Sequence, residues 1–393
     1  MRMGERDSAA IAEEEEEEAG DLEPFFYDEA AAVAEAAAAA ERRRLQEEEE
    51  AREKEARAGR LAAHNAVMEL ITETDPETNI VFYNRYHEED FSQFDIDEVS
   101  PLPPMRFTAT DYRPGEAKMY TTNMVNVLAV RIVPDDGDAV PFPIAVYGSL
   151  IVRDDLDRKC LPLFRRSRDD PQLIASKDDS LILTGPQRGL VLEDALYFEF
   201  DLKLKGDQVG GEDRQLSKGL LWFNGVYIET NLLLEQKLLT AVRGVTLDRC
   251  RRLNRLYPVQ VMYAFVSDAV EATVSVQVLQ GHFFYGKITA CTSRVKDSIL
   301  LYDSSLVAGG AAMAAHQGND HFASVRLLRP VMAVCLHEML IISILAQVDV
   351  TKYTRRTIHF KPAVNGGHET QITCGVNSLL VKVNWSLMYP AGK

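Results

Sequence analysis

The chain has 393 residues, enough for two or three small domains or for one large domain with a tail. Its 46% apolar and 26% charged residues are typical of a folded protein and exclude a fully disordered chain. The net charge of −17 lies mostly in residues 1–70, which carry 9 Lys and Arg against 21 Asp and Glu. This charge excludes nonspecific binding to nucleic acids or anionic membranes, although a local basic patch could still act.

The cysteines and the N-terminus indicate the compartment. The five cysteines are far apart in the sequence, form no CxxC pair and are odd in number, which favours a reduced, cytoplasmic or nuclear setting. The first residues contain no apolar run that would serve as a signal peptide. The most apolar stretch, Val331–Val348, is interrupted by His337, Glu338 and Gln347, so we expect a buried strand or core helix there and no transmembrane segment.

The first 73 residues predict an acidic arm. We expect a disordered acidic tail over residues 1–28 and a helix over residues 29–73, where Ala, Glu and Arg dominate. Pairs four residues apart, Glu48 with Arg52 and Glu53 with Arg57, are expected to support this helix. A coiled coil needs an apolar seam, and Leu45 is almost the only large apolar residue in the middle of the arm. We therefore predict a single helix, with a partner-docking helix as the alternative.

A segment rich in aromatic and acidic residues follows the helix. Asp75-Pro76 ends the helical pattern, and we place one mainly-β domain over residues 74–390. Its first part, Tyr83–Asp97, is closed by three prolines within Ser100–Pro104. We expect this segment to pack as a strap over the surface of the domain, with an exposed peptide-docking motif as the alternative.

From residue 120 onward the apolar residues alternate. In Leu196–Lys205 apolar and charged residues take turns, which predicts a half-buried antiparallel strand. Turn residues separate further runs of this kind: Val125–Val133, Ile144–Arg153, Val259–Val266, Val270–Leu279, Phe283–Cys291, Val325–Leu336, Thr357–Phe360 and Ser378–Ser386. Only Leu232–Arg243 has a helical pattern within the domain. We therefore predict a mainly β fold, an antiparallel β-sandwich or partly closed barrel.

Several segments in a fixed order carry a family resemblance. They are Ser100–Arg106, Val125–Leu128, Tyr147-Gly148, Arg153-Asp154, Ser176–Asp178, Ser180–Pro186, Arg188–Leu190, Leu216–Gly219, Ala269–Thr273 and Gly286–Ile288. Together they resemble a plant family, expanded in grasses, that is known only as a domain of unknown function. The resemblance spans roughly Met68–Ser386. It implies a stress or defence setting, because the same domain occurs behind a ribosome-inactivating domain in jasmonate-induced cereal proteins, and it implies no catalytic residues.

That association raises rRNA depurination as an alternative function. Depurinating enzymes of this kind use a helix with a Glu and, one turn later, an Arg. Glu271 is followed three residues later by Val274 and lies in strand-patterned sequence, so this pair cannot form. Glu50 and Arg52 in the arm lack the required spacing.

Other catalytic and metal motifs are incomplete. His337-Glu338 starts like a zinc-protease motif, but position 341 is Ile, so we interpret His337 as a core histidine. His316 and His321 are a weak metal alternative. Thr184–Leu190 has glycines like a phosphate loop, but their spacing and Pro186 favour a turn between strands. We predict no catalytic, cofactor-binding or metal-binding residue.

Two arginine clusters are the candidate binding sites. They comprise Arg165, Arg166, Arg168, Arg249, Arg251, Arg252 and Arg255. Guanidinium groups suit an anionic partner, such as RNA or the acidic arm itself, whereas solvated loops with local salt bridges are the alternative. We predict a non-enzymatic binding protein with an unidentified protein partner. RNA is a disfavoured partner, a membrane is not expected, and the oligomeric state is left open.

Overall fold

The computed structural model describes residues 28–74, 79–112, 120–133, 142–206, 211–225, 242–243, 259–281, 284–306, 313–314, 323–349 and 352–390. Two compact units divide the chain, residues 1–62 and residues 63–393. The predicted tail, apart from residue 28, lies outside the described residues. So do the second arginine cluster, His316 and His321, and most of the predicted helix Leu232–Arg243.

A single long helix, α1 (Glu29–Ile71), forms the arm, as predicted. Asp28 caps its first turn, because its carboxylate accepts hydrogen bonds from the amides of Ala30 and Ala31 at 3.0 and 3.1 Å. The expected pairs of Glu48 with Arg52 and Glu53 with Arg57 are not formed. Arg44 instead bridges Glu41 at 2.6 Å and Glu48 at 3.8 Å. Neither α1 nor any other described helix has an apolar stretch that could cross a bilayer.

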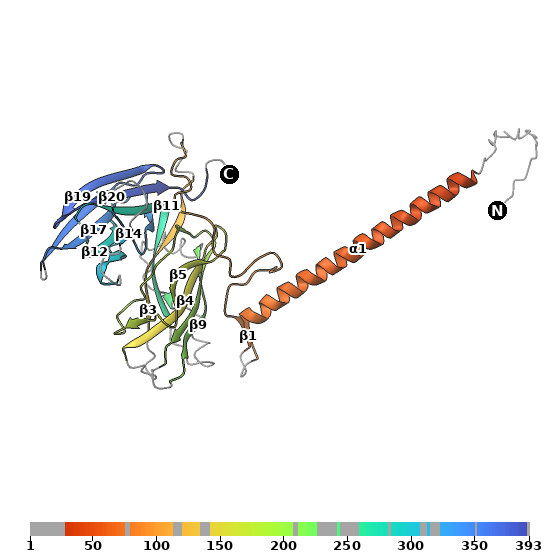
Figure 1. The fold of residues 1–393 in the computed structure, drawn as a ribbon, viewed down its shortest axis with the longest axis horizontal. Coiled ribbons are helices and arrows are strands. Elements are labelled where there is room, and N and C mark those ends of the chain that lie inside the picture. The colour runs from red at the N-terminus through yellow and green to blue at the C-terminus, as the bar shows by residue number, and fades with distance from the viewer. Residues whose placement is uncertain are drawn as a thin grey trace, which may run out of the picture. The chain divides into compact units, whose positions relative to one another are not determined.

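Antiparallel strands make up the second unit, as the alternating pattern predicts (Figure 1). A short pair joins β1 (Thr72–Thr74) to β2 (Val81–Tyr83). Five strands form one sheet: β4 (Ile144–Arg153), β5 (Leu161–Arg166), β6 (Gln172–Ile174), β8 (Ala195–Leu204) and β9 (Arg214–Asn224). Four strands form another: β12 (Gly286–Thr292), β13 (Ile299–Asp303), β17 (Leu340–Gln347) and β18 (Tyr353–Phe360).

A larger sheet connects these two. In the described chain it has nine strands: β3 (Thr122–Ile132), β7 (Leu190–Val191), β10 (Val242–Arg243), β11 (Val259–Gln280), β14 (Met313–Ala314), β15 (Ala323–Val325), β16 (Val331–Cys335), β19 (Gly367–Cys374) and β20 (Asn377–Ser386). A short 3₁₀ turn, η2 (Ser304–Leu306), follows β13. No sheet closes on itself among the residues described.

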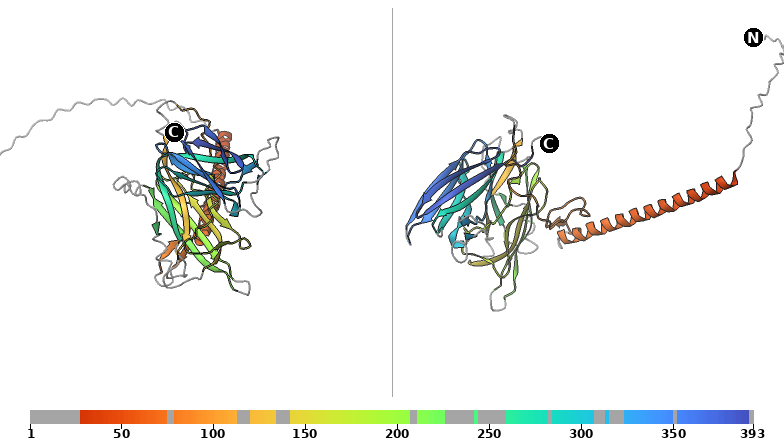
Figure 2. Two further views of the ribbon diagram at one scale, coloured as in Figure 1. Left: turned by 90° about the vertical axis from the view of Figure 1, so that its left-hand side faces the viewer. Right: turned by 45° about the horizontal axis from the view of Figure 1, so that its top comes forward.

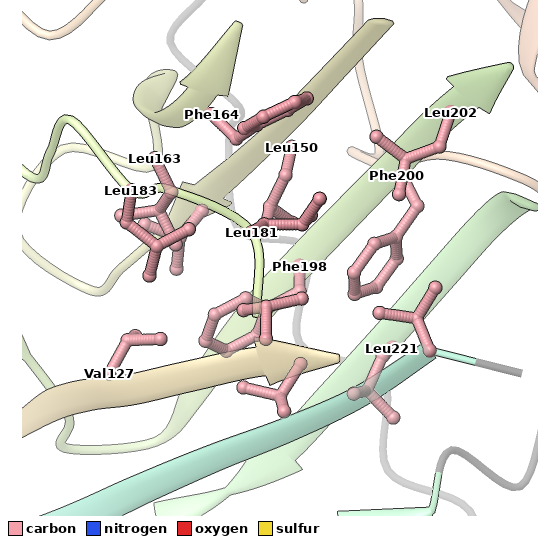
Figure 3. Close-up of a cluster of buried hydrophobic side chains, with 14 of the residues drawn as sticks. Val127, Leu150, Leu163, Phe164, Leu181, Leu183, Phe198, Phe200, Leu202 and Leu221 are labelled. Atoms are coloured by element: carbon pink, nitrogen blue, oxygen red, sulfur yellow. The ribbon is translucent and has the colours of Figure 1, made fainter. Parts of the chain in front are cut away.

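The long strand β11 is shared by two sandwiches, which are visible as two groups of strands in Figures 1 and 2. Its first half packs with β3 against the five-stranded sheet, and Leu150 and Phe198 of that sheet share one hydrophobic core with Val127 of β3 (Figure 3). Its second half packs with β20 against the four-stranded sheet. The ladder shifts register between Val266 and Ala269, next to Asp268 with φ of 46°. The two predicted runs Val259–Val266 and Val270–Leu279 are thus one bulged strand.

Two further details of the prediction are wrong. Residues 242–243, at the end of the predicted helix, form strand β10, which pairs with β11. His337 is not a core residue: it is exposed in the turn between β16 and β17. Its neighbours in the sequence are apolar because the adjoining strands are buried, and the turn itself faces solvent.

The predicted strap packs on the second unit, which confirms that interpretation. We define the strap as residues 84–106. Tyr86, Phe91 and Ile96 are buried, with exposures of 3%, 4% and 6%. Phe91 and Ile96 contact Ile71 in the last turn of α1. The carbonyl of Ile96 accepts a hydrogen bond from Arg153 at the end of β4, so the strap lies on the outer face of the five-stranded sheet.

Candidate functional site

The first arginine cluster lies at the end of β5 and in the turn that follows. Two of its members are neutralised locally: Arg166 pairs with Asp170 at 2.5 Å, and Arg168 pairs with Asp213 at 2.6 Å. Arg165 is exposed and forms no ion pair within the described part of the chain. The structure therefore divides these three candidates into two arginines in surface salt bridges and one arginine without an ion pair among the described residues.

Arg165 lines a pocket of about 380 Å³ between the strap and the outer face of the five-stranded sheet. This volume is at the lower end of the range for small-molecule sites. The lining residues come from the strap and from β4, β5, β8 and β9: Asn84, Arg85, Asp97, Ser149, Ile151, Cys160, Arg165, Glu199, Phe200, Asp201 and Lys218.

Strand register brings four of these residues into one row. Ser149 on β4 is opposite Arg165 on β5 and opposite Asp201 on β8, and Asp201 is in turn opposite Lys218 on β9. Directly opposed residues share a face of the sheet, so this row forms the floor of the pocket. Gly148 precedes Ser149 with φ of 114°, and a Cβ there would lie 2.0 Å from the Asp201 carbonyl oxygen. Only glycine permits this close approach of β4 and β8.

One wall of the pocket is a buried ion network that attaches the strap to the sheet. Glu199 accepts hydrogen bonds from Arg153 at 2.6 Å and from Arg85 at 2.8 Å, and Arg85 also pairs with Asp97 at 2.9 Å. Arg153 has no exposed surface and lies 5.5 Å from the ring centre of Tyr86. Burial alone would raise the pKa of Glu199, but the two guanidinium groups outweigh it and hold the pKa below the usual value.

The opposite rim contains a second paired cation. Lys218 contacts Glu73 on β1 at 2.8 Å, and the Asn84 amide donates to the same carboxylate oxygen at 2.7 Å. Burial raises the pKa of Glu73, but these two groups lower it further, and the net shift is downward. Lys218 is therefore largely neutralised by Glu73.

Two charges in the pocket are left without an ionic partner. Among the lining residues that the structure describes, Arg165 forms no ion pair, and Asp201 accepts one hydrogen bond from the neutral Gln215 amide at 3.0 Å. They lie on either side of Ser149, two strand spacings or about 10 Å apart at the backbone. The pocket thus offers one free cation and one free carboxylate on the same floor.

The thiol of Cys160, which lines the pocket, is stabilised in its protonated form. Burial raises the pKa of the Cys160 thiol, and its Sγ lies 3.3 Å from the Ile96 carbonyl as a hydrogen-bond donor. The thiolate is the reactive form of cysteine, so a raised pKa disfavours attack.

Glu271, the residue weighed for depurination, is structural. It lies in β11 with 2% exposure and accepts hydrogen bonds from the amides of Met105 and Gly189, both at 2.7 Å. Burial raises its pKa more than these donors lower it.

The phosphate-loop candidate Thr184–Leu190 is a connection in which Arg188 forms a bidentate pair with the buried Asp154 at 2.6 and 2.9 Å. No group of three metal-ligating side chains occurs in the described ranges.

Sequence reasoning found Arg165 but missed the other pocket residues. The alternation in Leu196–Lys205 places Glu199 and Asp201 on the charged face of a strand, and this was the available signal. It predicts solvent on that face, whereas Glu199 is 5% exposed because the strap covers it. Arg85 and Lys218 carried no local signal.

Comparisons with known proteins give a family but no activity. The family described as "Domain of unknown function (DUF6598)" matches residues 124–383. No curated protein matches the chain. Among solved structures, human GIVD cytosolic phospholipase A2 is 9% identical over 67% of this chain and 33% of that chain, with a TM-score of 0.18. The chain thus spans about a third of that protein, and a likeness this weak carries no argument.

Proposed function

Because the chain belongs to the DUF6598 family, whose function is unknown, we propose a function from its own pocket: binding of a small ligand that carries both a negative and a positive group. The observation that carries this proposal is the pair of Arg165 and Asp201, which share the pocket floor and lack ionic partners in the described structure. A carboxylate or phosphate on the ligand pairs with Arg165, and an ammonium group pairs with Asp201. A free zwitterion and a charged peptide segment both have this chemistry.

Isothermal titration calorimetry of the full chain with zwitterions of increasing charge separation tests the proposal. Glycine, 4-aminobutyrate and 6-aminohexanoate are the probes, with acetate and methylammonium as singly charged references. A capped peptide containing one Asp and one Lys separates a peptide ligand from a free zwitterion. We expect a zwitterion or the peptide to bind more tightly than either reference; equal binding of all probes would refute the proposal.

Two variants identify the groups involved. Arg165→Ala and Asp201→Asn should each weaken binding of the preferred probe at least about tenfold, because a hydrogen bond to a charged group contributes about 1.5–3 kcal/mol. Asp201→Asn should strengthen acetate binding, because it removes a repulsive carboxylate. Arg166→Ala is the matched control, since Arg166 is adjacent and already paired with Asp170.

We also propose that this role is non-enzymatic and that the protein is cytoplasmic or nuclear. We place the role in plant stress or defence responses, as the family resemblance implies. The raised pKa of the Cys160 thiol and the burial of Glu271 support a binding role. The alternative is a ribosome-associated or depurinating protein. Incubation of the purified chain with ribosomes tests it: release of adenine would contradict the non-enzymatic proposal.

A further inference from the structure

Two exposed aromatic rings lie at one end of the four-stranded sheet, away from the pocket residues. Tyr285 and Tyr353 are 46% and 52% exposed. Gln347 is opposite Tyr353 in the ladder, and its amide donates to the carbonyl of Tyr285 at 2.8 Å. The two tyrosines therefore lie on either side of Gln347 at the end of the outer face.

Two exposed valines from neighbouring turns lie beside them. Val348 follows Gln347 and is 37% exposed, and Val376 in the β19–β20 turn is 70% exposed. The turns touch, because Cγ2 of Val348 is 3.3 Å from the position of a Cβ on Gly375. Gly375 has φ of 64°, so this tight turn favours glycine and projects Val376 outward. We name Tyr285, Val348, Tyr353 and Val376 the apolar tip.

Cationic side chains lie close to the apolar tip along β18 and its preceding turn, with Arg355 on the same face as Tyr353 and Arg356 on the opposite face. Lys352, Arg355 and Arg356 are exposed and form no ion pair with any residue that the structure describes. Lys352 closes the turn after Val348, since its carbonyl accepts the Val348 amide at 2.8 Å. Lys287 lies in the row next to the tyrosines and pairs with Asp303 at 3.7 Å. Asp349 is the acidic residue of the same turn, so positive charge predominates.

We propose that the apolar tip inserts into the interfacial region of a membrane that contains anionic lipids. Exposed apolar patches mark interaction sites, and tyrosine is enriched at the membrane interface. The adjacent cations match anionic headgroups. The overall negative charge acts weakly here, because salt screens charges beyond about 8 Å. The net charge and the interrupted apolar stretch led us to expect no membrane contact, but they left a local basic patch open. Membrane binding by the tip is independent of the pocket.

Sedimentation of the full chain with vesicles tests this proposal. The vesicles contain phosphatidylcholine alone or phosphatidylcholine with phosphatidylserine. We expect binding mainly to the mixed vesicles, at least a tenfold loss of partitioning in Val376→Asp, and loss of the phosphatidylserine preference in the double variant Arg355→Glu with Arg356→Glu. Leu173→Asp is the matched control, because Leu173 is 66% exposed on β6 of the other sandwich; it should bind like the parent.

Three results would overturn the proposal. These are equal binding to both vesicle types, no binding to either, and unchanged binding by Val376→Asp, which would indicate adsorption by charge without insertion. Circular dichroism and the thermal midpoint show whether each variant folds. If Val376→Asp does not fold, Tyr353→Ser replaces it with the same expected loss, because Tyr353 belongs to the same tip.

Discussion

Two buried glutamates hold the strap on the two sandwiches by different chemistry. Glu199 on the first sandwich is neutralised by two guanidinium groups. Glu271 on β11 instead accepts hydrogen bonds from two backbone amides and forms no ion pair within the described chain. Both are nearly inaccessible, with exposures of 5% and 2%. Their pKa values move in opposite directions, downward for Glu199 and upward for Glu271. Two guanidinium groups in direct contact outweigh burial at Glu199, whereas at Glu271 two amide donors and the more remote charges of Arg106 and Arg188 do not.

The largest effect is expected when the paired glutamate is changed. Glu199→Gln leaves Arg153 without its carboxylate in a site with no exposed surface. Breaking a buried pair from one side costs about 3–5 kcal/mol. We expect a loss of that size in urea unfolding at pH 7. A loss below about 1 kcal/mol would show that the network contributes little to the attachment of the strap.

A smaller, pH-dependent effect is expected for Glu271→Gln. A carboxyl group with a raised pKa in the folded state binds a proton that the unfolded chain has released, so it costs stability as pH rises above the usual value of 4.5. The variant removes this cost. Its NH2 group cannot accept the hydrogen bond that the replaced oxygen accepts from Met105 or Gly189, which lowers its stability at every pH. The stability difference between variant and parent should nevertheless change in the variant's favour between pH 4 and pH 7 in urea titrations.

In the same titrations, the effect of Glu199 on the change of stability with pH should have the opposite sign. Because its pKa is lowered in the folded state, the ionised Glu199 carboxylate stabilises the fold at pH values above its usual pKa. This contribution is lost as the pH falls through the lowered pKa. The difference between Glu199→Gln and the parent should thus shrink toward low pH. Parallel pH profiles for the two variants would contradict the contrast between these sites.

The smallest stability effect is expected at the pocket. Arg165→Ala changes an exposed side chain without an ion pair in the described structure, so its unfolding free energy should stay within about 0.5 kcal/mol of the parent. Thermal denaturation measures this. A larger loss would mean that Arg165 supports the fold, and any loss of ligand binding would then reflect damage to the pocket.

The amino-acid sequence determined which segments of this protein form a helix and which form strands. Residues 29–71 form a helix because helix-forming residues continue without interruption, and Ile144–Arg153 and Ala195–Leu204 are strands because apolar side chains alternate. The strap was also predictable from its aromatic residues and prolines. These signals are local: each depends on neighbours a few positions away.

Only the tertiary structure decided which charges are buried, paired or free. Arg85 and Glu199 are 114 positions apart, and no local pattern connects them. Arg165, Arg166 and Arg168 are equivalent in the sequence, but only the path of the neighbouring strands leaves Arg165 facing a pocket. The same holds for the apolar tip, where the turn after β17 meets the turn between β19 and β20. Whether two charged side chains form an ion pair depends on the distance between them, and the packing of segments that are far apart in the sequence sets this distance. The type of a residue and the spacing of apolar residues around it do not encode such distances.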